Sequence, residues 1–214
     1  MSNIIIDTEK QLGAVKGSFS SIPEVQTRAQ DELVFWNNRK ESDPAVYPRL
    51  KEYWEYVNFG DGWTPSGTAW SSAFVSYLLR GQEFPKKSAH RLYIQDIIDK
   101  KNPSWSAFSI PKTDNLQLHV GDVLIKPRSG SYGNSHGDVV YKIEKGQAFL
   151  IGGNLGDTAR TTEIFKVDQN GFVLEDVSPY LIILKKKGMK IDTKIFLIPI
   201  ALGSILFLKR NMKK

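Results

Sequence analysis

The chain has 214 residues, a net charge of +6 and no cysteine. The absence of cysteine excludes a disulfide framework, a thiolate zinc site and a cysteine nucleophile. Only three histidines are present, which leaves few ways to build a histidine-rich metal site, and we expect neither a metal nor a cofactor. A hydrophobic content of 41% and a charged content of 24% are typical of one globular domain with a short appendage.

The excess positive charge is concentrated at the C-terminus. Residues 185–214 contain nine basic side chains and one acidic side chain, a net charge of +8, whereas the rest of the chain has 20 basic and 22 acidic side chains. Proteins that bind nucleic acids usually carry a basic stripe on the folded domain itself. We therefore expect no nucleic-acid partner.

The tail also contains an apolar run. Residues 195–208 are fourteen residues without a charge, bracketed by lysines. As a helix they would cover about 21 Å, short of a hydrocarbon core of ~30 Å, but snorkelling lysines and local thinning of the bilayer reduce the mismatch. The alternative is a buried helix or strand of the soluble domain. We predict a membrane anchor in residues 188–214, whereas residues 1–9 do not fit a cleaved signal peptide.

The body of the chain begins with helical periodicity. Residues 1–23 are polar and favour a flexible N-terminal arm. Apolar residues three and four positions apart then predict helices, and Ser66 or Thr68 is a candidate cap for the third of them. The predicted helices cover residues 24–39, 46–58, 69–80 and 90–100.

From about residue 116 the pattern changes to short apolar runs separated by turn residues, which is typical of strands. Helices followed by strands predict an α+β domain over residues 24–187 with a small antiparallel sheet. The predicted strands lie within residues 120–125, 137–143, 148–151, 172–174 and 180–184.

Three polar residues fall where these elements would meet. Ser71 lies in the first turn of the third predicted helix, where the helix dipole and free backbone N–H groups favour a developing negative charge. His136 begins a strand and would take the serine proton, and Asn154 at the end of the next strand would orient the imidazole. Serines at helix starts also act as caps, so spacing alone leaves the role of Ser71 open.

Several segments in register resemble the DUF2272 family. The match centres on WSSAFVSY (70–77), which is similar to a tryptophan–serine signature of that family. It extends over about residues 31–187, nearly the whole body. The other matching segments are ESDP (41–44) with the Tyr53–Trp54 pair, Phe84 with SAHRLYI (88–94), VGDV (120–123), SHGDVV (135–140), IGGN (151–154) and YLIILK (180–185).

This resemblance implies a papain-like fold, because DUF2272 proteins are thought to be distant relatives of the NlpC/P60 and CHAP amidases and peptidases of peptidoglycan. In those relatives a cysteine opens the helix, a histidine begins the sheet and a polar residue follows on the next strand. The resemblance therefore implies Ser71 as nucleophile, His136 as base and Asn154 as the orienting residue. A serine hydroxyl has a far higher pKa than a thiol and needs a well-placed base.

Other residues are secondary candidates. Asp138 lies two residues beyond His136 on the same strand face, where it either orients the imidazole or closes the turn. His90 and Trp70 lie in matching segments and are candidates for substrate binding. A capping or core hydrogen-bonding role is the alternative for His90, and a core position is the alternative for Trp70.

Two further sets of residues favour structural roles. Glu41 and Asp43 have the composition of a two-carboxylate muramidase site, but they precede a proline and look like a helix start. His119 matches no part of the family pattern, and we expect it at the surface.

The sequence thus predicts a membrane-anchored peptidoglycan hydrolase, an amidase or endopeptidase. An anchor without a leader suits the internal membrane of a virion or the bacterial envelope, with other virion proteins as further partners. One alternative is a papain-like binding module for wall peptides or virion proteins that has lost catalysis. Another is a structural membrane protein whose body docks against a capsid.

Overall fold

The computed structural model describes residues 22–110, 116–128, 131–188 and 198–199. Residues 1–21 of the predicted arm and most of the predicted anchor therefore lie outside the described residues, and residues 22–23 of the predicted arm belong to the first helix. All four predicted helices are present, with ends shifted by a few residues. They are α1 (Ile22–Trp36), α2 (Tyr47–Tyr56), α3 (Ser71–Leu78) and α4 (His90–Ile98), and the short 3-10 helix η2 (Pro44–Val46) precedes α2.

The strands form one antiparallel sheet, and the predicted α+β class is confirmed. Six strands follow the order β5-β4-β3-β2-β6-β1, and the two-residue β7 extends the sheet beside β1. The strands are β1 (Trp105–Ser109), β2 (Val123–Arg128), β3 (Ser131–Glu144), β4 (Gln147–Gly152), β5 (Arg160–Lys166), β6 (Ile182–Lys186) and β7 (Ile198–Pro199).

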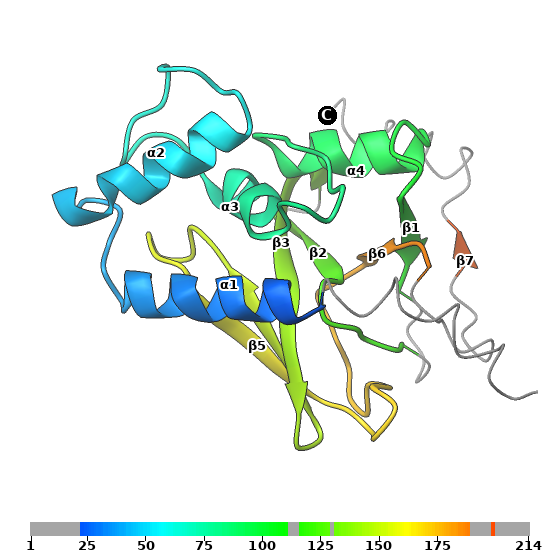
Figure 1. The fold of residues 1–214 in the computed structure, drawn as a ribbon. Coiled ribbons are helices and arrows are strands. Elements are labelled where there is room, and N and C mark those ends of the chain that lie inside the picture. The colour runs from blue at the N-terminus through cyan, green and yellow to red at the C-terminus, as the bar shows by residue number, and fades with distance from the viewer. Residues whose placement is uncertain (1–21, 111–115, 129–130, 189–197, 200–214) are drawn as a thin grey trace, which may run out of the picture.

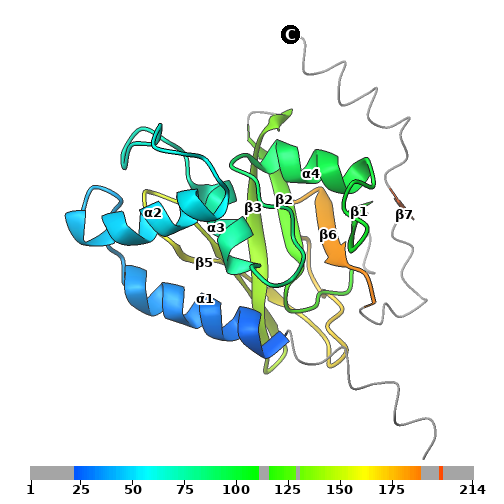
Figure 2. The ribbon, with the colours of Figure 1, turned by 45° about the horizontal axis from the view of Figure 1, so that its top comes forward.

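The helices cover one face of the sheet. Figure 1 and Figure 2 both place α1, α3 and α4 on the same side of β2 and β3. Side chains alternate between the faces of a strand, so Ile125, Val139 and Leu184 point into the core shared with the helices. This core contains four fully buried tryptophans: Trp36, Trp54, Trp70 and Trp105.

A second core covers the opposite face. Leu124, Val140 and Ile183 alternate with the residues of the first core and pack against apolar side chains from the segments 116–118 and 173–180. The sheet is therefore buried on both sides near its centre, and polar side chains placed there must find partners inside the protein.

Three strands were not predicted, namely β1, β5 and the two-residue β7, and one predicted strand is absent. In β5 the burial pattern has no clear alternation, because most side chains of this edge strand are exposed or only partly buried. Charged side chains on an edge strand hinder its pairing with another chain. In β1 only Trp105 is buried. The predicted strand 172–174 makes isolated bridges instead, one between Gln117 and Phe172 and one between Val167 and Val173.

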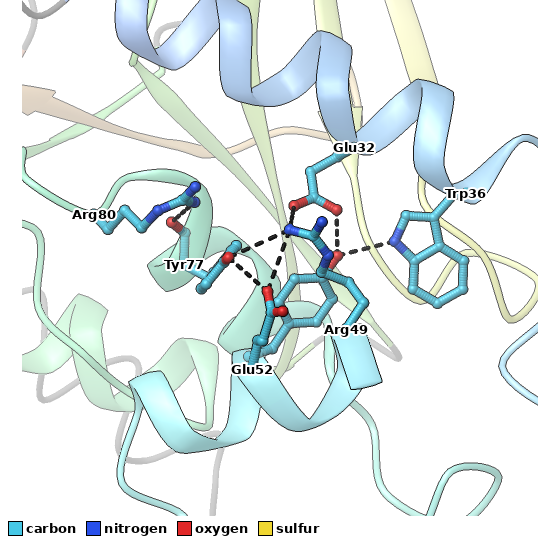
Figure 3. Close-up of polar contacts among 7 residues, drawn as sticks. Glu32, Trp36, Arg49, Glu52, Tyr77 and Arg80 are labelled. Atoms are coloured by element: carbon cyan, nitrogen blue, oxygen red, sulfur yellow. Dashed lines mark hydrogen bonds and ion pairs between the residues drawn. The ribbon is translucent and has the colours of Figure 1, made fainter. Parts of the chain in front are cut away.

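A buried polar network joins the first three helices (Figure 3). Glu32 on α1 is 2% exposed, and one of its carboxylate oxygens accepts a hydrogen bond of 2.5 Å from the hydroxyl of Tyr53 on α2. The other oxygen lies 3.2 Å from the Arg49 guanidinium, which also donates to the hydroxyl of Tyr77 on α3. Burial raises the pKa of Glu32, and the hydrogen bond from Tyr53 and the charge of Arg49 oppose the rise. The network fixes the position of α3 against α1 and α2.

The C-terminal lysines do not all belong to a tail. Lys185 lies in β6, is 2% exposed and forms an ion pair of 2.5 Å with the buried carboxylate of Asp122. The same ammonium group lies 3.3 Å from Nδ1 of His119. His119 is half-buried, whereas the sequence predicts it at the surface. Part of the positive charge counted with the tail is therefore neutralised inside the domain.

The apolar run 195–208 of the predicted anchor lies outside the described residues except for the strand Ile198–Pro199, which pairs with Ser109 and Phe108 of β1. Within the described ranges, no helix has both the length and the apolar character that a membrane crossing requires.

Candidate active site

Ser71 lies in the first turn of α3, as predicted, although the helix begins at Ser71 itself and its capping differs from the prediction. Trp70 occupies the N-cap position, and no side chain caps the helix. The hydroxyl of Thr68 instead accepts a hydrogen bond of 3.0 Å from the backbone N–H of Thr64. Backbone N–H groups in the first turn of a helix have no acceptor within that helix. Ser71 therefore lies beside unpaired backbone N–H donors and at the positive end of the helix dipole.

The hydroxyl of Ser71 pairs with a histidine. Its Oγ lies 2.7 Å from Nε2 of His90, which is the first residue of α4. The other ring nitrogen of His90, Nδ1, forms a short hydrogen bond with the hydroxyl of Tyr93. Ser71 is 5% exposed, His90 6% and Tyr93 fully buried. The three side chains thus form a hydrogen-bonded row that is almost closed to water.

Burial lowers the pKa of His90 well below its usual value, and the charge of Arg128 also lowers it, as does His136. The carboxylate of Asp138 has the opposite effect on this pKa but does not outweigh burial. His90 is therefore neutral near pH 7, and one of its ring nitrogens carries a free lone pair. If the ring proton is on Nδ1 and bonded to Tyr93, the lone pair on Nε2 faces the hydroxyl of Ser71.

His136, the predicted base, does not pair with Ser71. Its Nε2 lies 3.0 Å from Oδ1 of Asp138, and its Nδ1 lies 3.1 Å from the guanidinium of Arg128. A guanidinium group only donates, so Nδ1 is the acceptor and the ring proton is on Nε2, bonded to the carboxylate. Both nitrogens are committed, and neither has a lone pair free for the serine proton.

Strand geometry explains this separation. His136 and Asp138 lie opposite Lys126 and Leu124 on β2, and Leu124 belongs to the core on the face away from the helices. His90 lies on the helix side, and the two imidazole centroids are 5.7 Å apart. The two rings are in contact, but the hydroxyl of Ser71 forms its hydrogen bond with His90 and not with His136.

Asp138 is the residue that orients His136. Its second oxygen accepts a hydrogen bond of 2.5 Å from the hydroxyl of Tyr180 and lies 3.2 Å from Nζ of Lys126. Burial alone would raise the pKa of Asp138, but the hydrogen bond from His136, together with Lys126 and Tyr180, holds it below its usual range. Burial and the nearby carboxylate raise the pKa of Tyr180, which stays protonated as a donor.

Two glycines make room for these side chains. A Cβ at Gly137 would lie 2.5 Å from the Tyr93 hydroxyl and 3.1 Å from Nδ1 of His90, so the ring of His90 packs where this residue has no side chain. A Cβ at Gly152 would overlap Oδ1 of Asp138 and lie 2.9 Å from Nε2 of His136. Gly152 of the IGGN segment is thus a packing requirement of the His136–Asp138 pair, whereas a Cβ at Gly153 would lie 2.6 Å from Phe74 and Trp70.

The other predicted site residues lie apart from this chemistry. Asn154 has a φ of 57°, and its side chain makes no hydrogen bond within the described part of the chain, so Asp138 takes the orienting position expected for it. Trp70 is fully buried, stacks on Trp36 at 4.6 Å and donates to Glu41 at 2.7 Å. Its ring is therefore not a surface on which a substrate can stack.

The two carboxylates considered for a muramidase site are structural. The side chain of Asp43 accepts a hydrogen bond of 2.9 Å from the backbone N–H of Ala45 and caps η2, as a helix start requires. Glu41 is buried against Trp70.

Among residues 22–110, 116–128 and 131–188, no group of three or more His, Asp or Glu side chains is placed to hold a metal ion.

Four residues of the site were missed in the sequence: Tyr93, Lys126, Arg128 and Tyr180. Tyr93 follows His90 by three positions, which places two helical side chains on one face, so this pair was open to prediction. The other three reach the site only through the pairing of β2 with β3 and the packing of the segment before β6. A single sequence contains no local signal for such contacts.

Comparison with protein-family models gives no match, and comparison with curated proteins gives none either. Among solved structures, the chain is similar to the crystal structure of a wild-type endolysin, LysIME-EF1, with 14% sequence identity and a TM-score of 0.31. The alignment covers 62% of this chain and 62% of the endolysin chain, so it spans less than two thirds of either.

Proposed function

We propose that this protein is a serine-dependent hydrolase of amide or peptide bonds in peptidoglycan, with a papain-like fold. The observation that carries the proposal is the distance of 2.7 Å between Oγ of Ser71, at the start of α3, and Nε2 of His90. A nucleophile beside a neutral imidazole, with a third group on the far ring nitrogen, is the arrangement that activates a hydroxyl.

The proposed reaction begins with the hydroxyl of Ser71. Oγ attacks the carbonyl carbon, its proton passes to Nε2 of His90, and the carbonyl electron pair moves onto oxygen. Backbone N–H groups at the start of α3 stabilise this oxyanion. When the C=O bond re-forms, the C–N bond breaks and His90 gives its proton to the leaving amine. Water then hydrolyses the acyl-enzyme by the same steps, and the proton returns to Ser71.

The substrate class and the location rest on the sequence. Peptidoglycan is the substrate implied by the resemblance to the DUF2272 family, whose matching segments include Ser71, His90 and His136. The lysine-bracketed apolar run 195–208 supports attachment to a bilayer, in a bacterial envelope or a virion membrane.

Truncation of the chain after Gly188 is expected to release the protein from membranes in a flotation assay, and continued flotation of the truncated protein would contradict the anchor.

The test of the hydrolase is a comparison of the wild-type full chain with three variants on purified peptidoglycan. Release of new amino groups is expected from the wild type and from Ser76→Ala, a control on the same helix whose hydroxyl bonds to the backbone oxygens of Pro85 and Lys87. Ser71→Ala and His90→Ala are expected to lose at least about 10³-fold in rate. Equal rates in all four proteins would overturn the proposal.

A second candidate is a wall-binding module without catalysis. The enclosure of Ser71 and His90, which are 5% and 6% exposed, favours this alternative, because buried polar rows also serve packing. A binding module would cosediment with peptidoglycan and release no amino groups from it. The variants Ser71→Ala and Ser76→Ala would then bind equally well.

A further inference from the structure

Arg128 is the last residue of β2, and the sheet brings it to the buried His136. The pairing of β2 with β3 is regular through Lys126 and His136, and then the register shifts between Pro127 and Arg128. Irregularities of this kind re-aim a side chain and are frequent beside functional sites. Here the guanidinium lies 3.1 Å from Nδ1 of His136 and is only partly buried.

A chain of buried hydrogen bonds fixes this guanidinium. The hydroxyl of Tyr180 donates to Asp138, which accepts the proton of Nε2 of His136, and Nδ1 of His136 then accepts from Arg128. His136 and Asp138 are both fully buried. Because only one tautomer of His136 satisfies both neighbours, the ring presents its lone pair to Arg128 in a fixed direction.

The charge of Arg128 has no counter-ion in the described part of the chain. Asp138 is the carboxylate of the hydrogen-bonded row, but its oxygens pair with Nε2 of His136 at 3.0 Å and with Nζ of Lys126 at 3.2 Å. No ion pair within residues 22–110, 116–128 or 131–188 involves Arg128, whose guanidinium instead donates to Nδ1 of His136. A partly exposed guanidinium that is held in place and not neutralised is prepared to bind an anion.

We propose that Arg128 is the receptor for a carboxylate of the ligand, and that His136 and Asp138 are positioning residues that hold its guanidinium. The N–H groups not bonded to His136 form a planar fork that matches a carboxylate with two parallel hydrogen bonds. Arg128 contacts His136, and the ring of His136 lies 5.7 Å from the ring of His90, so the carboxylate would bind near the histidine that pairs with Ser71. The inference deepens the proposed function and rests on it for the nature of the substrate.

Binding is tested without catalysis. The full chain, labelled with ¹⁵N, is titrated with N-acetylalanine and with its neutral amide, and the side-chain resonances of Arg128 and His136 are followed. Saturable shifts are expected with the acid alone. The affinity should fall by about 10- to 100-fold in Arg128→Gln, as expected when hydrogen bonds to a charged group are lost. Arg91→Gln, an equal change of charge at an exposed residue next to His90, should bind like the wild type.

Two further variants test whether the acid binds because the Arg128 guanidinium is held in a fixed orientation or only because position 128 carries a positive charge. Arg128→Lys keeps the charge without the fork, and His136→Gln removes the imidazole that holds the fork; both are expected to bind the acid more weakly than the wild type. Equal affinity of the wild type and Arg128→Gln, or equal shifts with the acid and the amide, would overturn the carboxylate receptor. Wild-type affinity in His136→Gln would overturn the positioning role.

The outcome for the receptor is distinct from the outcome for the hydrolase. If the acid binds through Arg128 but no peptidoglycan bond is cleaved, the receptor stands and the proposed reaction fails. If cleavage depends on Ser71 and His90 but peptides with a carboxylate and with an amide are cleaved with equal kcat/KM, the receptor fails and the reaction stands. In the supporting result, the preference for the carboxylate peptide disappears in Arg128→Gln.

Discussion

Oγ of Ser71 lies 2.7 Å from Nε2 of His90, although the two residues begin different helices and are nineteen positions apart. The first turns of α3 and α4 meet at this contact, against the glycine at position 137 of β3. The partner of the proposed nucleophile is therefore set by helix packing and not by the strand histidine that the family pattern suggests.

The pH dependence of the reaction should reflect the buried state of His90. Burial and nearby positive charge hold its pKa well below its usual value, so the ring stays neutral and able to accept a proton in mildly acidic solution. We expect the acid limb of the kcat/KM profile to fall below pH ~6.5, the usual value for histidine. An acid limb at or above this pH would show that another group takes the proton.

The same residue should make folding stability depend on pH. Between its lowered pKa in the folded state and ~6.5 in the unfolded state, only the unfolded chain binds the proton, so acid favours unfolding. The free energy of unfolding should fall as pH drops below ~6.5, by up to about 1.4 kcal/mol per pH unit from this group. Denaturant unfolding of His90→Gln should show a shallower fall, whereas Arg91→Gln should match the wild type.

Gly152 should tolerate no side chain. In Gly152→Ala the new Cβ would overlap Oδ1 of Asp138, which must then move away from His136. We expect a loss of about 1–3 kcal/mol in the free energy of unfolding, together with weaker carboxylate binding. Gly62→Ala is the matched control, because a Cβ there has no neighbour within 4 Å. Equal stability of the two variants would contradict the close packing at Gly152.

Much of this architecture was open to prediction from the sequence. Periodicity identified all four helices, and Ser71 was correctly placed at the start of α3 because the apolar face of WSSAFVSY has a clear helical period. The strand at His136 was also predicted. Edge strand β5 was missed because its exposed residues lack the alternation that marks a half-buried strand.

The pairing of side chains was harder to predict than the elements. His90 was assigned to substrate binding or the core, and Asn154 to the orientation of His136, because the order of motifs gives no distances. Asp138 takes the orienting position since residues two apart on a strand share a face. Trp70 was a candidate for substrate contact, but its indole fills the core and bonds to Glu41.

The network around Glu32 should contribute to stability. In Glu32→Ala the buried hydroxyl of Tyr53 loses its acceptor, and Arg49 loses its buried partner while keeping Glu52 at 3.3 Å. We expect a loss of about 2–3 kcal/mol in the free energy of unfolding. The neighbouring Asp31→Asn, on the exposed side of α1, should change it by less than about 0.5 kcal/mol. A similar loss in both variants would argue against a specific role for the network.

The most direct test of the account is covalent labelling of Ser71. The full chain is incubated at neutral pH with a fluorophosphonate, which phosphonylates only activated serines, and the modified residue is located by peptide mass spectrometry. We expect one adduct, on Ser71, with at least about a 10²-fold slower reaction in His90→Ala and an unchanged rate in Ser76→Ala. No adduct on Ser71, or equal labelling of Ser71 in the wild type and His90→Ala, would contradict a serine activated by His90.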